Sequence, residues 1–209
     1  SDDFFRSDYI VLWSANPLYT RIPDMHFILE ARYRGAQVVV IAPDYNATAI
    51  HADLWLNPKI QTDAALALAI AHVMVAENLY QADYVKEQTD LPFLIRKDTG
   101  RFLREQDVVK GGRADAFYVW DEAQGAIALA PGSQGMKRAT IALGDLRPAL
   151  EGTRKMKLAD GSSAKVEPLF EMLRRRLKAE STPEATQTST GIPAALIRRV
   201  AREMAAAKS

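Results

Sequence analysis

The chain has 209 residues, of which 48% are hydrophobic, so it fits one domain or one and a half and can bury a sizeable core. Its formal net charge of +1 at pH 7 gives no electrostatic argument for nucleic acid or an anionic membrane as a partner. It contains no cysteine, which excludes disulfides, thiolate zinc sites, iron–sulfur ligation and cysteine nucleophiles within this chain.

The first elements alternate apolar runs with polar turns. Residues 9–13 form an apolar run followed by turn residues, which predicts a buried strand. Pro23 suits the first turn of a helix that ends near Gly35. Residues 37–41 lack alternation, as expected for a strand whose two faces are both covered.

A second helix-rich stretch follows. We expect a short helix over 47–52 and a short strand over 53–56 that lies near a sheet edge. Thr62 is a suitable N-cap for a helix that runs to about residue 78. That helix is apolar nearly all round, which predicts burial between layers, and its apolar stretch is too short to span a bilayer. Residues 84–88 are expected to form a further short helix.

The order of these elements defines the fold class. Strands that alternate with helices indicate a parallel sheet with right-handed crossovers. We therefore predict an α/β fold, a Rossmann-like doubly wound parallel sheet with helices on both faces. Residues 1–209 are expected to form one domain with an irregular excursion at about 97–165. Because the first strand begins almost at once and the chain stops just after a helix, we expect a piece of a longer protein.

The second half of the chain carries hairpin signals and then helices. Short strands are expected over 117–120 and 126–130, and again over 155–158 and 164–166, where Asp160-Gly161 predicts a tight turn. An amphipathic helix is expected from Leu169, a short helix from Thr182-Pro183, and a last helix with an apolar stripe around 196–204. Within the first of these, Glu171 is placed to pair with Arg175 at i,i+4.

The turn after the first strand is a candidate anion site. Asn16, Thr20 and Arg21 supply side-chain donors there, and Arg21 is able to pair a phosphate through two N–H groups. The turn has no glycine, however, and the G-x-G-x-x-G fingerprint of dinucleotide-binding folds is absent. An ordinary strand-to-helix loop is the alternative.

Acidic residues follow the second and third strands. Asp44 ends the second strand, where an acid can accept hydrogen bonds from a ribose; a solvated turn aspartate is the alternative. Thr62 and Asp63 suit a helix start for capping reasons alone. Asp63 also matches the adjacent N–H donors of a guanine edge. The three histidines, His26, His51 and His72, have no ligand spacing, and no nucleophile–base–acid set stands out.

Several ordered segments resemble the molybdopterin oxidoreductases of the dimethyl sulfoxide reductase superfamily. The likeness is greatest to the catalytic subunits of the branch that holds respiratory nitrate reductase, selenate reductase and ethylbenzene dehydrogenase. It covers residues 8–103 densely and 165–205 loosely. The matching segments are Tyr9-Ile-Val-Leu-Trp-Ser-Ala-Asn16, Thr20-Arg-Ile-Pro-Asp-Met-His-Phe27, Val40-Ile-Ala-Pro-Asp-Tyr45, Ala52-Asp-Leu-Trp-Leu56, Thr62-Asp-Ala-Ala-Leu66, Tyr84-Val-Lys-Glu-Gln-Thr-Asp-Leu-Pro92 and Thr190-Gly-Ile-Pro193.

The resemblance implies a cofactor and assigns residues to it. It implies that the chain is the domain that holds the guanosine and pyrophosphate end of a molybdopterin guanine dinucleotide in an enzyme of anaerobic respiration. Molybdenum and iron–sulfur clusters would then be held by parts outside this chain, which alone should be inactive. The residues implied in cofactor binding lie in three loops: Ser14, Asn16, Thr20 and Arg21; Asp44 and Tyr45; and Gln61, Thr62 and Asp63.

Two departures from the family pattern concern these loops. The family usually has glycine where Ser14 and Gln61 stand, so each side chain is expected to crowd the dinucleotide. The implied partners are the remaining domains of the catalytic subunit and an iron–sulfur electron-transfer subunit, and the implied compartment is the periplasm or the cytoplasm. A free-standing Rossmann-like domain for NAD or another nucleotide, and a non-catalytic docking module, are the alternative functions.

Overall fold

A computed structural model describes residues 2–133 and 140–207 of the chain. It divides into two compact units, the first made of Ser1–Leu79 with Leu177–Ser209 and the second of Tyr80–Arg176. No helix among the described residues is long and apolar enough to cross a membrane.

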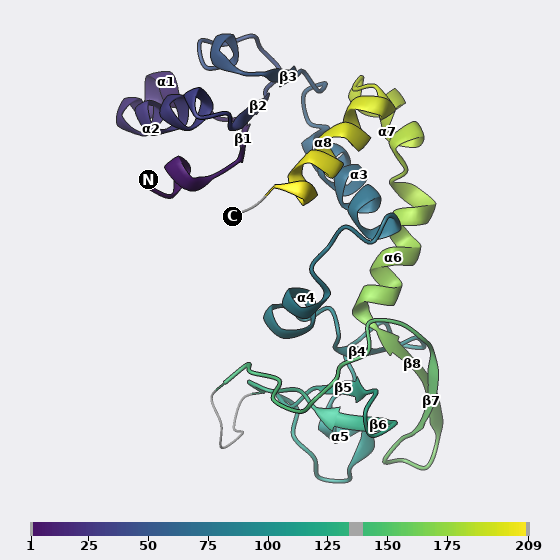
Figure 1. Ribbon diagram of the computed structural model, residues 1–209. Coiled ribbons are helices and arrows are strands. Elements are labelled where there is room, and N and C mark those ends of the chain that lie inside the picture. The colour runs from purple at the N-terminus through teal and green to yellow at the C-terminus, as the bar shows by residue number, and fades with distance from the viewer. Residues whose placement is uncertain (1, 134–139, 208–209) are drawn as a thin grey trace. The chain divides into compact units, whose positions relative to one another are not determined.

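The first unit combines three short strands with helices from both ends of the chain (Figure 1). Its N-terminal elements are η1 (Asp2–Arg6), β1 (Tyr9–Trp13), α1 (Pro17–Thr20), α2 (Ile22–Tyr33), β2 (Gln37–Ile41), η2 (Ala49–His51), β3 (Leu54–Leu56) and α3 (Asp63–Ala76). Its C-terminal helices are α7 (Pro183–Thr190) and α8 (Ala194–Ala206), and α6 (Leu169–Glu180) begins in the second unit.

The three strands form a parallel sheet in the order β1-β2-β3. In this register Tyr9 lies beside Gln37, and Val39 beside Leu54. The parallel pairing, the three strands and the edge position of β3 were all predicted from the sequence. Since each strand is joined to the next by a helix-bearing crossover, the strands all end at one edge of the sheet.

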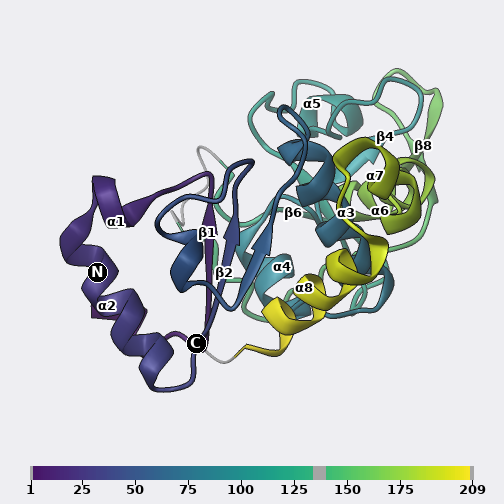
Figure 2. The same cartoon turned by 90° about the horizontal axis from the view of Figure 1, so that it is seen from above.

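Helices cover both faces of this sheet. Alternate residues of β2 point to opposite sides, and both sets are apolar and buried. Val39 and Ile41 pack in a cluster with α3 and α8, whereas Val38 and Val40 pack with Met25 and Ile28 of α2 on the other side. Figure 2 shows α1 and α2 on one side of the strands and α3 with α8 on the other. The doubly wound prediction is confirmed.

Some local predictions for this unit were wrong. The four-residue helix α1 was predicted as loop. Thr62 occupies the N-cap position of α3, but its side chain makes no capping hydrogen bond. Helix α3 is also not buried all round, because Leu68 is 46% exposed on the side away from the buried Leu66 and Ile70.

The second unit is built from small antiparallel sheets. Its elements are α4 (Ala82–Gln88), β4 (Leu94–Arg96), α5 (Glu105–Val108), β5 (Tyr118–Asp121), β6 (Ala126–Leu129), β7 (Arg154–Lys157), β8 (Ser163–Pro168) and the start of α6. The β5-β6 and β7-β8 hairpins confirm the predicted turns. The strand β4, which pairs with β8, and the helix α5 were not predicted.

A buried carboxylate organises one side of this unit. The side chain of Glu167, on β8, is only 1% exposed, and its oxygens accept hydrogen bonds from Arg175 at 2.6 and 3.1 Å and from Lys97 at 2.7 Å. The predicted Glu171–Arg175 pair is wrong, because Arg175 turns to Glu167 while Glu171 pairs with Arg174 at 2.8 Å. Chiefly through the Arg175 hydrogen bond, the pKa of Glu167 is lowered to about 2.

Candidate functional site

The candidate site lies in the first unit, at the edge where the three parallel strands end. Three loops leave the sheet there: Ser14–Asn16 after β1, Ala42–Thr48 after β2 and Asn57–Thr62 after β3. Open α/β sheets bind their ligands at the carboxyl ends of the strands. Of the nine predicted cofactor-binding residues, six lie in these loops and Asp63 begins α3, whereas Thr20 ends α1 and Arg21 lies between α1 and α2.

The first loop makes a sharp turn at Ser14. This residue has a φ of 50°, in the left-handed region that favours glycine, and its backbone N–H donates to the carbonyl of Ile41 at 2.8 Å. Asn16 then occupies the N-cap position of α1. The turn therefore leaves β1 abruptly and places Asn16 near the end of β2.

A buried threonine fixes Asn16. The hydroxyl of Thr48, which is fully buried, donates to Asn16 Oδ1 at 2.6 Å and accepts the backbone N–H of Leu18 at 3.2 Å. Asn46 Oδ1 in turn accepts the N–H groups of Thr48 and Ala49, both at 3.1 Å. With Oδ1 engaged by Thr48, the amide NH₂ of Asn16 is the group left to donate to a ligand.

The other two predicted phosphate contacts have partners of their own. The hydroxyl of Thr20 donates to the backbone carbonyl of Asn16 at 3.0 Å. Arg21 is 77% exposed and lies 3.6 Å from Asp24, an ion pair on the surface of α2. The backbone N–H groups of Tyr19 and Thr20 both donate to Asn16. The turn after β1 thus retains the side chain of Asn16 for an anion, and Arg21 at the other end of α1 is a second candidate, whereas the amides of α1 are engaged.

The second loop presents two exposed residues. The carboxylate of Asp44 makes no hydrogen bond or ion pair to any other described side chain, which leaves it open to solvent. Tyr45 packs edge to face on Trp55, with ring centroids 5.0 Å apart, and the indole N–H of Trp55 donates to the carbonyl of Ala42 at 3.0 Å. Tyr45 is therefore an exposed aromatic side chain, and its packing partner Trp55 is held in place by a hydrogen bond.

The third loop is tied to the C-terminal part of the chain. Gln61 has a φ of 68°, and Thr62 donates its hydroxyl to the carbonyl of Lys59 at 2.6 Å. The backbone N–H of Lys59 donates to the carbonyl of Thr190 at 2.9 Å, and its ammonium to that of Thr188 at 3.2 Å. A cation at the C-terminal end of α7 is favoured by the helix dipole. The loop before α3 is held in place by these contacts.

Asp63 is the residue at which two of the loops meet. Its Oδ1 accepts the indole N–H of Trp13 at 2.8 Å and lies 3.4 Å from the hydroxyl of Ser14. No described residue hydrogen bonds to Oδ2. The backbone N–H groups of Asp63, Ala64 and Ala65 likewise have no acceptor among the residues the structure describes, because Thr62 has turned its hydroxyl away.

The structure brings some of the predicted residues together and leaves others apart. Ser14 and Asp63 are in contact, and Thr20 contacts Asn16, whereas Arg21, Asp44 and Tyr45 contact none of the other candidates directly. Trp13 and Thr48, which hydrogen bond to Asp63 and Asn16, were not predicted from the sequence. An Asn-x-Thr sequence after a strand is a turn signal that pointed to the Thr48 region; nothing in the sequence pairs Trp13 with Asp63.

Metal ligation has no support in the parts that are described. Across 2–133 and 140–207, no group of three His, Asp or Glu side chains is placed to hold a metal ion. His72 is half-buried on α3, and burial, with the nearby Arg198 charge, lowers its pKa.

Comparison with known proteins identifies the family of this chain. The family model of molybdopterin oxidoreductases matches residues 2–191, and the chain belongs to that family. The resemblance read from the sequence is confirmed.

Among its relatives, the alpha subunit of perchlorate reductase from Dechloromonas aromatica is 49% identical over 99% of this chain. The alpha subunit of chlorate reductase from Ideonella dechloratans is 48% identical over the whole chain, and that of respiratory nitrate reductase from Haloferax mediterranei 38% identical over 99% of it. The chain spans only 24%, 22% and 22% of the length of these three proteins.

Proposed function

We propose that this chain is the part of a molybdenum oxidoreductase catalytic subunit that binds the guanosine and pyrophosphate end of a molybdopterin guanine dinucleotide. One observation carries the proposal. Asp63 presents a carboxylate with one oxygen held and the other open, beside three open backbone N–H groups at the start of α3. Family membership and the position at the carboxyl edge of a parallel sheet support it.

The donors and acceptors at this position suit guanine. The Watson–Crick edge of guanine carries an oxygen acceptor at O6 beside N–H donors at N1 and N2. The free oxygen of Asp63 is an acceptor for the N–H donors, and the amides of Ala64 and Ala65 are donors for O6. Adenine presents an NH₂ donor in place of O6 and a bare acceptor at N1, so an adenine placed in the same orientation mismatches both groups.

The other loops supply the remaining contacts of the proposal. Asp44 is an open acceptor for ribose hydroxyls, with Tyr45 beside it. Asn16 offers its amide NH₂, and Thr20 and Arg21 complete the phosphate side. Ser14 and Gln61 are both exposed, and the Ser14 hydroxyl lies toward Asp63. The Ser14 hydroxyl contacts only the oxygen of Asp63 that Trp13 already holds, and neither side chain hydrogen bonds to Oδ2, so the donors and acceptors present suit the nucleotide.

The proposed whole enzyme divides its tasks between parts. When bound, the cofactor supplies the molybdenum centre for two-electron chemistry, either oxygen-atom transfer or hydroxylation. This chain binds and orients the nucleotide end. It has no cysteine for iron–sulfur ligation, so we assign electron transfer to other domains and to an iron–sulfur partner subunit. By itself the chain is expected to be inactive.

Calorimetric titration with GDP, and with NAD for comparison, tests the proposal. We expect saturable GDP binding by the unmodified chain and no heat from NAD. Asp63→Ala should weaken GDP binding by about tenfold or more, because a charged acceptor for the base is lost.

A matched control separates recognition from helix stability. Asp83 is an exposed aspartate in the first turn of α4, as Asp63 is in the first turn of α3. Asp83→Ala should leave GDP binding unchanged. Binding of NAD without GDP, or equal losses from the two variants, would contradict the proposal.

A further inference from the structure

The indole of Trp13 and the carboxylate of Asp63 form a contact that the sequence pattern does not predict. The two residues are 50 positions apart, and Trp13 Nε1 lies 2.8 Å from Asp63 Oδ1. That distance and the ionised acceptor make it a strong hydrogen bond. The hydroxyl of Ser14 reaches the same oxygen at a longer 3.4 Å.

The packing of Trp13 makes its N–H a fixed donor. Trp13 is the last residue of β1, and its partly buried ring packs against the cluster formed by β2, β3, α3 and α8. A tryptophan that is packed on its apolar face and hydrogen-bonded at its nitrogen has little rotational freedom. The position of its N–H is therefore set by the sheet and not by the loop.

An unrestrained aspartate at this place has other options. In the first turn of a helix its carboxylate can fold back onto the open backbone N–H groups or extend into water. In the first conformation the carboxylate oxygens are not available to a ligand, and in the second their orientation is not fixed. The bond to Trp13 holds Oδ1 away from the amides of Ala64 and Ala65, so that these amides and Oδ2 remain open together.

We infer that Trp13 is a positioning residue that aligns the Asp63 carboxylate for the base of the bound nucleotide and thereby sets the preference for guanine over adenine. This inference rests on the proposed function. Trp13 acts through Asp63 and needs no contact with the nucleotide. Its effect should therefore fall on base preference and not on the affinity for the ribose and phosphates, which other loops contact.

The test compares the affinities of the full chain for GDP and ADP in two matched variants. Trp13→Phe removes the N–H and keeps most of the ring. Trp120→Phe is the control, because it also removes an indole N–H and keeps most of the ring, on β5 of the second unit and outside the three loops of the candidate site. We expect Trp13→Phe to lower the ratio of GDP to ADP affinity at least fivefold, with ADP affinity changed less than twofold. Trp120→Phe should leave the ratio unchanged.

The outcomes separate the two proposals. If the unmodified chain does not bind GDP, the proposed function fails, and this inference fails with it. If GDP binds and Asp63→Ala weakens it, but Trp13→Phe keeps the base preference, only the inference is overturned. Equal changes in the ratio for the two tryptophan variants would also overturn it, since they would show a general structural effect.

A second measurement does not depend on the folding of Trp13→Phe. The chain has three tryptophans, Trp13, Trp55 and Trp120, so ¹⁵N labelling gives three indole N–H resonances. Trp55→Phe and Trp120→Phe assign the Trp13 signal by elimination. Saturating GDP should shift that signal, and ADP should shift it far less. A Trp13 signal that GDP does not move would overturn the inference.

Discussion

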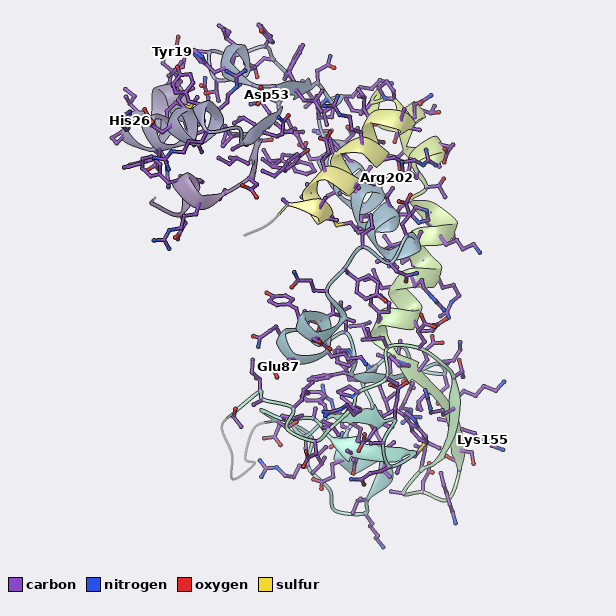
Figure 3. The ribbon with its side chains drawn as sticks, viewed as in Figure 1. Tyr19, His26, Asp53, Glu87, Lys155 and Arg202 are labelled. Atoms are coloured by element: carbon purple, nitrogen blue, oxygen red, sulfur yellow. The ribbon has the colours of Figure 1, made fainter. Side chains whose placement is uncertain are left out.

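Arg32 and Asp53 fasten helix α2 to the sheet: the Nε and Nη2 atoms of Arg32 donate to Asp53 Oδ1 at 3.0 and 2.8 Å. The other oxygen, Oδ2, accepts the backbone N–H of Val38 at 2.9 Å. Asp53, labelled in Figure 3, precedes β3, so one carboxylate joins α2, β2 and β3. Burial raises the pKa of this carboxyl, but the hydrogen bonds from Arg32 and Val38 bring it below its ordinary value.

Asp53→Ala should lower the free energy of unfolding by about 1–2 kcal/mol, because it leaves the Val38 N–H and the Arg32 guanidinium without their acceptor. Urea unfolding followed by circular dichroism measures the change. Asp44→Ala, an exposed residue of the same unit, is the control and should change the free energy by less than about 0.5 kcal/mol. An Asp53 variant as stable as the control would contradict the role given to this carboxylate.

Glycine at Ser14 or Gln61 should stabilise the chain. Both have left-handed backbone conformations, with φ of 50° and 68°, which cost a non-glycine residue about 1–2 kcal/mol. The greater flexibility of unfolded glycine offsets part of the gain, so we expect about 0.5–1 kcal/mol from each of Ser14→Gly and Gln61→Gly. Thermal and urea unfolding test this.

Asn78, with a φ of 55°, is the graded control for that experiment. Asparagine tolerates the left-handed region better than serine or glutamine, so Asn78→Gly should be nearly neutral. If Ser14→Gly and Gln61→Gly lowered the free energy of unfolding, the left-handed conformations of these two residues would not be a source of strain.

Local patterns in the sequence predict one part of this fold and not another. The sheet and its covering helices could be predicted, because the buried runs 9–13 and 37–41 and the helical spacing after Pro23 are local patterns. The strand β4 could not, because it has three residues and exists by pairing with β8, some 70 residues later. The four-residue α1 is too short to show a period.

The same division between local and distant contacts holds for the site. Asn16 and Asp63 were identified as candidates because each follows a predicted strand. The residues that hydrogen bond to them, Thr48 and Trp13, were not identified, because they lie 32 and 50 residues away in the chain. Sequence analysis also expected Thr62 to cap α3, whereas the positive φ at Gln61 and the nearby carbonyl of Lys59 draw its hydroxyl the other way.

Stability should depend on acid pH through Glu167. Its pKa is about 2 in the folded chain, against an ordinary value of 4.5. A lowered folded pKa contributes stability above the unfolded value, and that contribution is lost as the pH falls from about 5 toward 2. The shift corresponds to at most about 3 kcal/mol, and screening of the half-exposed Arg175 reduces it.

The free energy of unfolding, measured from pH 7 to pH 2 for the unmodified chain and for Glu167→Gln, tests this dependence. The variant should be less stable at pH 7, and its curve should fall less steeply below pH 5. Parallel curves would mean that other carboxylates dominate the acid response. Asp83→Ala provides the exposed-carboxylate comparison.

Thr48→Val should destabilise the first unit and weaken nucleotide binding. Valine keeps the shape but leaves Asn16 Oδ1 and the Leu18 N–H without their buried partner, at a cost of about 1–3 kcal/mol. The released Asn16 should lower GDP affinity several-fold. Thr48→Ser retains the hydroxyl and should restore both properties; failure of serine to do so would assign the effect to the lost methyl group.

The division of the first unit between the two ends of the chain has a consequence for its biosynthesis. Val39, Ile41 and Leu56 share a core with Ile192, Ile197 and Val200. A ribosome makes Leu56 before Ile192 by 136 residues, which is roughly 7–27 s at ordinary elongation rates. During that interval α3 is the only described helix already made that covers this face. The apolar face formed by Val39, Ile41 and Leu56 therefore stays partly uncovered until the segment with Ile192, Ile197 and Val200 has been made.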